Sequence, residues 1–285
     1  MPGSPPAVAV VTDSTAYLPP DLARKLTIVP LTVVVNGTPG LEMVDVNAEQ
    51  LAQALLARRQ VTTSRPAPEE FASVYRRLLD GGAAGVLSVH LSASLSGTYD
   101  SAMSAASAFG GRVEVVDSRS TGMGLGFPAL AAAEAAARHQ DLATVRAAAL
   151  AAVDRTTTLF YVDTLEFLRR GGRIGAASAL LGTALSVKPI LITSDDGVVV
   201  VRDRVRTASR ALSRLVDLVV EAAAESTVDI AVHHLAAPDR AETLAGRLKD
   251  RLGDRLRAGY LSEVGAVVGA HVGPGTVGAS VYRVD

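Results

Sequence analysis

The stretch Gly85-Val-Leu-Ser-Val-His-Leu-Ser-Ala-Ser-Leu-Ser-Gly-Thr-Tyr99 decides how this chain is expected to fold. Its first seven residues form an apolar run that predicts a buried strand, and the residues from about Gly97 to Phe109 follow a helical pattern. A loop rich in hydroxyl groups therefore lies where a strand gives way to a helix. In open α/β sheets ligands bind at this edge, and the unpaired N–H groups of a first helical turn attract anions. Because serine and threonine also start helices routinely, an anion site and a simple helix cap are both open.

Strand and helix patterns alternate around this stretch through the first half of the chain. Expected strands are 7–11, 28–35 (closed by the turn Asn36-Gly37), 85–91 and 113–116. Expected helices are 19–26, 46–58 with Asn47 as its cap, 69–79, 97–109 and two Ala-rich helices that end near 153. Loops are expected at 62–66 and 121–126. Strands separated by helices favour a mostly parallel sheet.

The second half of the chain changes character. The β-rich runs 188–193 and 198–204 flank Asp195-Asp-Gly197, which is typical of a hairpin. Other expected strands are 159–162, 228–235 and 275–284, and expected helices are 165–170, 176–185, 207–224 and 240–252. Hairpins combined with helices favour a mixed sheet. We therefore predict an α/β protein of two domains, residues 1–154 with a mostly parallel sheet and residues 155–285 with a mixed sheet.

Composition narrows the classes of function. With 285 residues, 48% of them hydrophobic and 20% charged, the chain has the composition of a globular protein. A net charge of −1 gives no reason to expect nucleic acid as a partner. The absence of cysteine excludes disulfides and thiolate metal sites, and the histidines lack metal-ligand spacing, so no metal is expected. Neither a signal peptide nor a membrane-spanning run is visible, so a soluble cytoplasmic protein is expected.

An ordered set of short motifs along nearly the whole chain resembles one family. The motifs are Val11-Thr-Asp-Ser-Thr15, Thr63-Ser-Arg-Pro66, Leu95-Ser-Gly-Thr-Tyr99, Asp117-Ser118, Arg170-Gly-Gly-Arg-Ile174, Lys188-Pro189, Val205-Arg-Thr207 and Gly269-Ala-His-Val-Gly-Pro-Gly275. Each motif alone is weak, but together they make the chain similar to the DegV family of bacterial fatty-acid-binding proteins. Two positions depart from the family pattern: Arg65 stands where glutamine is usual, and Ala93 stands where a second serine is frequent.

The resemblance implies a carrier of fatty acids that has no cofactor and is not itself an enzyme. A long-chain fatty acid such as palmitate or oleate would lie in an apolar tunnel between the two domains and exchange transiently with membranes. The catalytic subunit of a fatty acid kinase would bring ATP and phosphorylate the bound carboxylate to an acyl phosphate for phospholipid metabolism. Burial of about fourteen methylenes supplies on the order of 11 kcal/mol before the costs of binding, so apolar walls alone can hold such a ligand.

The resemblance also implies which residues meet the carboxylate. Thr63 and Ser96 lie in the matching loops, and each can donate an O–H to a buried carboxylate, which is costly to leave without donors. For His271, a place near the carboxylate and an ordinary core histidine are both open. Arg206 and Arg173 are expected docking positions for the kinase, against the alternative of a solvated basic surface.

Two other interpretations of the same residues are open: the protein is a serine hydrolase or a phospho-carrier that uses Ser96 and His271. The hydrolase reading is weakened because Leu95-Ser-Gly lacks the Gly-x-Ser-x-Gly turn. A nucleotide-binding enzyme is disfavoured because Phe127 stands where the dinucleotide fingerprint needs a glycine, and no Gly-Lys-Ser/Thr loop exists. Asp13 also lies at a strand end, but it would repel a carboxylate, so helix capping is its expected role.

Overall fold

Strand β6 (Val86–His90) is the buried strand that the sequence predicts, and all five of its residues are buried. The structure is a computed structural model that describes residues 7–180 and 187–285. It divides into two units, and β6 belongs to the first of them. The first unit runs up to Leu31 and resumes from Arg65 to Asp154, and the second contains Thr32–Ser64 and Arg155–Asp285. The segment Thr32–Ser64 thus groups with the second half, which differs from the predicted single division. The reason is that its strands and its helix pack against a helix near the C-terminus.

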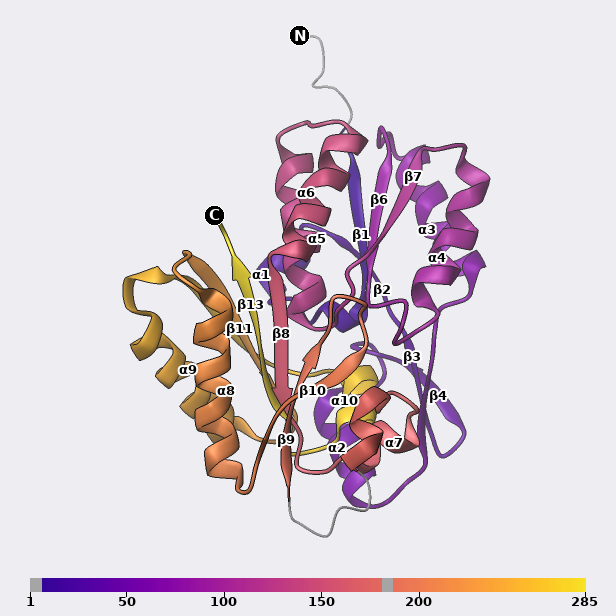
Figure 1. The fold of residues 1–285 in the computed structure, drawn as a ribbon. Coiled ribbons are helices and arrows are strands. Elements are labelled where there is room, and N and C mark those ends of the chain that lie inside the picture. The colour runs from indigo at the N-terminus through magenta and orange to yellow at the C-terminus, as the bar shows by residue number, and fades with distance from the viewer. Residues whose placement is uncertain (1–6, 181–186) are drawn as a thin grey trace. The chain divides into compact units, whose positions relative to one another are not determined.

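The first unit is built on a parallel sheet, as predicted. Its order is β2 (Thr27–Val29), β1 (Ala9–Asp13), β6 and β7 (Val113–Asp117), and every neighbouring pair is parallel. Helices α3 (Pro68–Asp80) and α4 (Thr98–Ala106) cover one face, and α5 (Met123–Ala137) and α6 (Leu142–Asp154) cover the other (Figure 1). Short elements complete the unit: η1 (Ser14–Ala16), α1 (Pro20–Ala23) and η2 (Ser107–Phe109). Because parallel strands end at one edge, the loops after β1, β6 and β7 gather there.

The predicted loop 121–126 is shorter in the structure, because α5 already begins at Met123. Gly122 makes the turn into the helix with a φ of +61°, a region that glycine enters without steric cost. Gly126 lies within the helix, where a Cβ would stand 2.5 Å from the Met123 sulfur and 3.2 Å from the carbonyl oxygen of Ala16. Gly122 therefore serves the turn into α5, and Gly126 serves the close packing of that helix.

The second unit contains a six-stranded mixed sheet, again as predicted. Its order is β10 (Val199–Val205), β9 (Lys188–Thr193), β8 (Thr156–Tyr161), β13 (Val277–Arg283), β11 (Val228–His234) and β12 (Leu256–Glu263). The predicted hairpin of β9 and β10 is confirmed, while β12 was not predicted. β12 pairs parallel to β11 at the edge of the sheet, and its residues alternate between half-buried and exposed. Helices α8 (Ala208–Ala223) and α9 (Pro238–Leu252) pack on this sheet. The 3-10 segment η4 (Gly253–Arg255) follows α9.

A small antiparallel sheet completes the second unit, in the order β4 (Thr38–Leu41), β3 (Thr32–Val35) and β5 (Val61–Ser64). Asn36 and Gly37 both have positive φ, +50° and +82°, which confirms the predicted two-residue turn. Helix α2 (Ala48–Leu56) begins as predicted at Asn47, whose side chain accepts a hydrogen bond from the Gln50 N–H. Helix α10 (Ala266–Val272) packs against α2, β3 and β5.

The prediction of a loop at 62–66 was wrong for its first residues, because Thr62 to Ser64 pair with β3 as the last part of β5. Helix α7 (Glu166–Arg170) lies where it was expected, and it packs against α10. Of the helix expected at 176–185, Gly175–Leu180 forms the 3-10 segment η3, and the rest lies outside the described residues.

Gly175 provides a test of how closely η3 packs against β10. Its φ is +51°, and a Cβ there would stand 2.4 Å from the carbonyl oxygen of Val199, so Gly175→Ala adds a backbone clash to backbone strain. Gly253, with a φ of +54° and nothing within 4 Å of its Cβ position, is the matched control that carries the strain alone. Urea unfolding should show a loss of about 1 kcal/mol for Gly253→Ala and about 2–4 kcal/mol for Gly175→Ala. Equal losses would contradict the close approach of Gly175 to β10.

Candidate functional site

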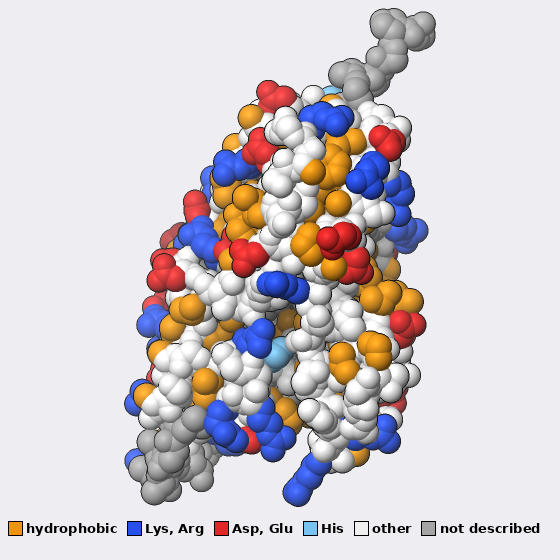
Figure 2. Space-filling model, turned by 90° about the vertical axis from the view of Figure 1, so that its right-hand side faces the viewer, with side chains coloured by type: hydrophobic (Ala, Val, Ile, Leu, Met, Phe, Trp, Pro, Cys, Tyr) orange, Lys and Arg blue, Asp and Glu red, His pale blue; other side chains and the backbone are white. Residues whose placement is uncertain are grey.

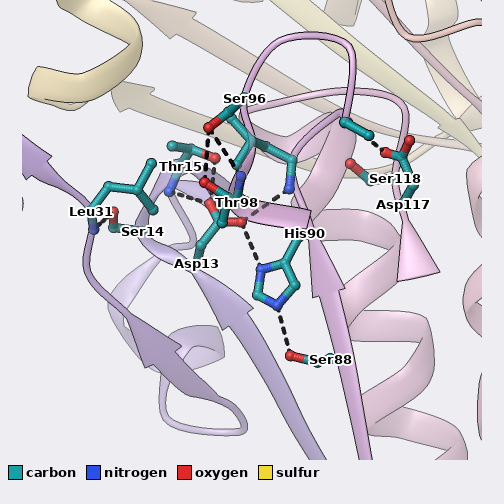
Figure 3. A network of polar contacts seen from close by, with 12 residues as sticks. Asp13, Ser14, Thr15, Leu31, Ser88, His90, Ser96, Thr98, Asp117 and Ser118 are labelled. Atoms are coloured by element: carbon teal, nitrogen blue, oxygen red, sulfur yellow. Dashed lines mark hydrogen bonds and ion pairs between the residues drawn. The ribbon is translucent and has the colours of Figure 1, made fainter. Parts of the chain in front are cut away.

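The serine-rich loop that follows β6 leads into α4, whose N-cap is Gly97, and no side chain caps the helix, so no serine of the loop is its cap. The half-buried Ser96 Oγ accepts a hydrogen bond from the Thr98 N–H at 3.3 Å and lies 2.9 Å from Thr98 Oγ1 (Figure 3). Either hydroxyl can be the donor in the second contact. When Thr98 donates, the proton of Ser96 is available to a ligand. The contacts that Ser96 makes with Thr98 are therefore compatible with a donor role toward an anion.

Hydrogen bonds tie this loop to the loop that follows β7. The Ser92 N–H donates to the Ser120 carbonyl at 2.8 Å, and the Ser118 N–H donates to the His90 carbonyl at 2.9 Å. Asp117 Oδ1 accepts from the N–H groups of Ala93 at 3.3 Å and Arg119 at 2.7 Å. The polar ends of two neighbouring strands thus hold each other in place, and Asp117, from the motif Asp117-Ser118, is one of the linking residues.

A buried Ser–His–Asp arrangement lies beneath the loop, and sequence reasoning missed it. His90 Nε2 lies 2.7 Å from Ser88 Oγ, and His90 Nδ1 lies 3.0 Å from Asp13 Oδ2 (Figure 3). The spacing of Ser88 and His90 could have revealed this contact, because alternate residues of a strand share a face. The three side chains are fully buried, and the hydroxyl of Tyr75 donates to Ser88 Oγ at 2.9 Å. This serine is an internal hydrogen-bonding group and not an exposed nucleophile, and the arrangement contains neither Ser96 nor His271.

In the second unit the structure brings together two of the predicted site residues, Thr63 and His271. Thr63 lies on β5 and His271 on α10, and Thr63 Oγ1 is 2.9 Å from His271 Nε2. The two elements pack against each other, and α10 also packs closely against α2, where it carries Gly269. A Cβ on Gly269 would stand 2.5 Å from the Leu51 Cδ2 of α2. A contact between residues 208 positions apart therefore depends on the grouping of segment Thr32–Ser64 with the C-terminal helix.

A buried acidic residue that the sequence did not single out fixes the start of α10. Glu42 is fully buried, and its Oε1 accepts a hydrogen bond from the Val267 N–H at 2.7 Å. The first N–H groups of a helix lack internal partners, and a carboxylate there is favoured by the helix dipole. Glu42, which follows β4 directly, therefore anchors the helix that carries His271.

The environment of His271 keeps its imidazole neutral. Burial, reinforced by the positive charge of Arg173, lowers the pKa of His271 to about 4. Nδ1 is buried against Gly171, where a Cβ would stand 2.1 Å from it, and it has no hydrogen-bond partner within the described part of the chain. A buried N–H without an acceptor is rarer than an unused lone pair, which favours the tautomer with its proton on Nε2. His271 then donates to Thr63 Oγ1, and the Thr63 hydroxyl proton is free for a ligand.

The same geometry bears on the phospho-carrier reading of His271. A phosphohistidine requires a ring nitrogen that a phosphorus atom can approach. In this protein Nε2 is hydrogen-bonded to Thr63 and Nδ1 is packed against Gly171. The structure therefore gives no support to a phosphoryl transfer through this ring.

The two arginines expected to dock a kinase lie on different elements of the second unit. Arg173 is half-buried and donates from Nη1 to the carbonyl of Gly171, beside the His271 ring. Arg206 is exposed between β10 and Thr207, the residue that caps α8. Basic and acidic side chains are interspersed over the face drawn in Figure 2.

Among the described residues, no cluster of three or more histidine, aspartate or glutamate side chains has the geometry to hold a metal ion. Within residues 7–180 and 187–285, no helix combines the length and the apolar character needed to cross a membrane.

The pKa of His271 predicts how stability depends on pH. The unfolded chain binds a proton at this ring near pH 6.5 and the folded chain only near pH 4, so the unfolded state takes up more protons between these values. The contribution of His271 to stability is therefore complete above pH 6.5 and is lost as the pH falls toward 4. The difference corresponds to roughly 3 kcal/mol.

We expect His271→Asn, which keeps a hydrogen-bonding side chain without a titrating ring, to flatten the dependence of the unfolding free energy on pH in this window. Burial also lowers the pKa of His233 to about 4, so a shallower slope should persist. An unchanged slope in chemical denaturation at several pH values would show that His271 is not the titrating group.

Comparison with known proteins places the geometry in a family. The model of the family described as "Uncharacterised protein, DegV family" matches residues 7–284. A DegV domain-containing protein of Streptomyces coelicolor is 53% identical over 279 residues, which covers 96% of this chain and 98% of that protein.

Solved structures give the same result. A DegV family protein from Thermus thermophilus, whose structure is described as showing fatty acid binding, is 35% identical with a TM-score of 0.92 and covers 98% of this chain and 100% of that one. DegV from Bacillus subtilis, described as a fatty acid binding protein, is 31% identical with a TM-score of 0.87 and covers 97% and 99% of the two chains. On the family match across residues 7–284 and the identity to its relatives, this chain belongs to the DegV family.

Proposed function

We propose that this protein binds a long-chain fatty acid and presents its carboxylate to a partner kinase, which phosphorylates it to an acyl phosphate. Two solved relatives, at 35% and 31% identity over nearly the whole chain, are described as fatty acid binding proteins. The observation in this chain that carries the proposal is the pair of Thr63 and His271, in which a neutral, half-buried imidazole contacts the Thr63 hydroxyl at 2.9 Å.

The pair prepares a hydrogen-bond donor for a carboxylate. A threonine hydroxyl has one proton, and that proton is free for a ligand only when the neighbouring group donates to the hydroxyl oxygen. The Nε2–H tautomer of His271 does this, so Thr63 donates to the carboxylate and not to the ring. Ser96, whose oxygen accepts from the Thr98 N–H, is the second proposed donor.

Neutral donors suit a carboxylate that must later react. Hydroxyl groups satisfy the oxygens of the bound acid without forming an ion pair, so the carboxylate keeps its negative charge and its nucleophilic character. In the proposed transfer, a carboxylate oxygen forms a bond to the γ-phosphorus of ATP while the bond to the bridging oxygen breaks and ADP leaves. The kinase would supply ATP and its metal ion, and this chain would act only as the carrier.

Removal of the proposed donors tests the binding site. Thr63→Val and Ser96→Ala each delete one hydroxyl, and a hydrogen bond to a charged group is worth about 1.5–3 kcal/mol. We expect each variant to bind a fluorescent fatty acid roughly 10- to 100-fold more weakly.

Two exposed hydroxyl residues serve as matched controls. Thr62→Val changes the neighbour of Thr63 on the opposite face of β5, and Ser104→Ala changes an exposed position of α4. Both controls should bind like the natural protein. Wild-type affinity in Thr63→Val and Ser96→Ala would refute the assignment of the carboxylate contacts.

Charge reversal tests the proposed docking residue for the kinase. Arg206 is exposed, so Arg206→Glu should leave fatty acid affinity unchanged while it slows acyl phosphate formation by the kinase at least roughly 10-fold, the cost of one lost charge pair. The matched control Lys249→Glu reverses an exposed charge on α9 and should leave the rate unchanged. Equal rates for Arg206→Glu and the natural protein would remove Arg206 from the docking surface.

A further inference from the structure

The carboxylate of Asp13, at the end of β1, has every acceptor position occupied. Its Oδ1 accepts from the Thr15 N–H at 3.0 Å and from the Thr15 hydroxyl at 2.6 Å. Its Oδ2 accepts from His90 Nδ1 and from the Leu91 N–H, each at 3.0 Å (Figure 3). Two oxygens offer about four lone-pair sites, so this set of donors is complete. The predicted cap of the following helix is present, but it accounts for only half of these contacts.

A directed chain of hydrogen bonds holds His90 in place. Asp13 can only accept, so the proton of a neutral His90 is on Nδ1, and Nε2 must then accept from the Ser88 hydroxyl. Ser88 in turn accepts from Tyr75, and burial raises the pKa of the Tyr75 hydroxyl, which keeps it a donor. The Phe71 ring packs against His90 with a centroid distance of 4.9 Å and limits its rotation. Tyr75, Ser88, His90 and Asp13 are all fully buried.

The network ends at the first residue of the serine loop. Leu91 follows β6 directly, and its N–H is the group that Asp13 binds from the neighbouring strand. The loop continues through Ser92 to Ser96 and enters α4 at Thr98. A buried carboxylate is costly, and a pair of apolar residues would fill this space at lower cost. What the carboxylate adds is a fixed starting point for the loop, because the Leu91 N–H binds a side chain that three further hydrogen bonds hold in place.

We propose that Asp13, held by the buried chain of His90, Ser88 and Tyr75, is a positioning residue that fixes the serine loop so that Ser96 can donate to the fatty acid carboxylate. The inference rests on the proposed function, because it assigns a role at the same binding site. Asp13 itself does not touch the ligand, since its own acceptor positions are filled and its charge would repel a carboxylate. It acts through the Leu91 N–H.

A double-mutant cycle tests this role. Asp13→Asn keeps the shape but puts an amide N–H₂ where one oxygen accepted, so it must break contacts to Thr15 or to His90 and Leu91. We expect Asp13→Asn to weaken fatty acid binding roughly 10- to 100-fold, as Ser96→Ala does. Because both changes act through one hydroxyl, the double variant should bind no more than about twofold more weakly than either single variant.

A matched control separates a loss of protein stability from a loss of fatty acid affinity. Val11→Ala removes buried methyl groups from the same strand, two residues before Asp13, and should lower the melting temperature without changing affinity. If Asp13→Asn does not fold, Tyr75→Phe is the second variant. It removes only the hydroxyl farthest from Asp13 in the hydrogen-bond network and should weaken fatty acid binding roughly two- to fivefold. A ¹⁵N NMR spectrum of the natural protein adds a readout of the network, and it should show His90 with its proton on Nδ1.

The outcomes separate the inference from the proposed function. Additive losses in the double variant, unchanged affinity in Asp13→Asn, or a His90 proton on Nε2 would each overturn the positioning role while Ser96→Ala still weakens binding. Unchanged affinity in Ser96→Ala would overturn the proposed carboxylate contact and the inference with it.

Discussion

The parallel alignment of β1, β6 and β7 is the constraint on which the first unit depends. Their carboxyl ends lie at one edge of the sheet, and the backbone groups freed there must find partners because several of them are buried. Asp13, Asp117 and the Ser120 carbonyl provide those partners for Leu91, Ala93 and Ser92. The serine loop owes its conformation to these neighbouring strand ends and not to its own sequence alone. In the proposed function this rigidity presents Ser96 to a carboxylate.

In the second unit, contacts between segments far apart in the sequence position the proposed donor. Thr63 and His271 come from segments 208 residues apart, and they meet because β5 and α10 pack together. Glu42 caps α10 from the end of β4, and Gly171 and Gly269 allow close contact on two sides of that helix. Burial then keeps His271 neutral, and in the proposed function a neutral ring sets the direction of the Thr63 hydroxyl. Packing thus decides the protonation state on which the proposed donor depends.

Local patterns in the sequence predicted much of the fold but little of the hydrogen-bonding network. The apolar run before Leu91, the turn at Asn36-Gly37 and the cap at Asn47 act through neighbouring residues, and the structure confirms all three. The edge strand β12 and the short helix α10 were missed, because half-exposed alternation and a Gly-rich sequence give weak periodicity. The contacts of Asp13 with His90 and Leu91, and that of Glu42 with Val267, join residues 77, 78 and 225 positions apart, and no single-sequence pattern encodes such contacts. Thr63, Ser96 and His271 were singled out because they match family motifs, and their role at a carboxylate is still a prediction.

Native mass spectrometry of the purified protein, followed by denaturing extraction and lipid analysis, measures whether the protein carries a fatty acid. We expect close to one fatty acid per chain, retained under native conditions and released on denaturation. A protein that carries no lipid and also fails to bind added palmitate or oleate would contradict the proposed function.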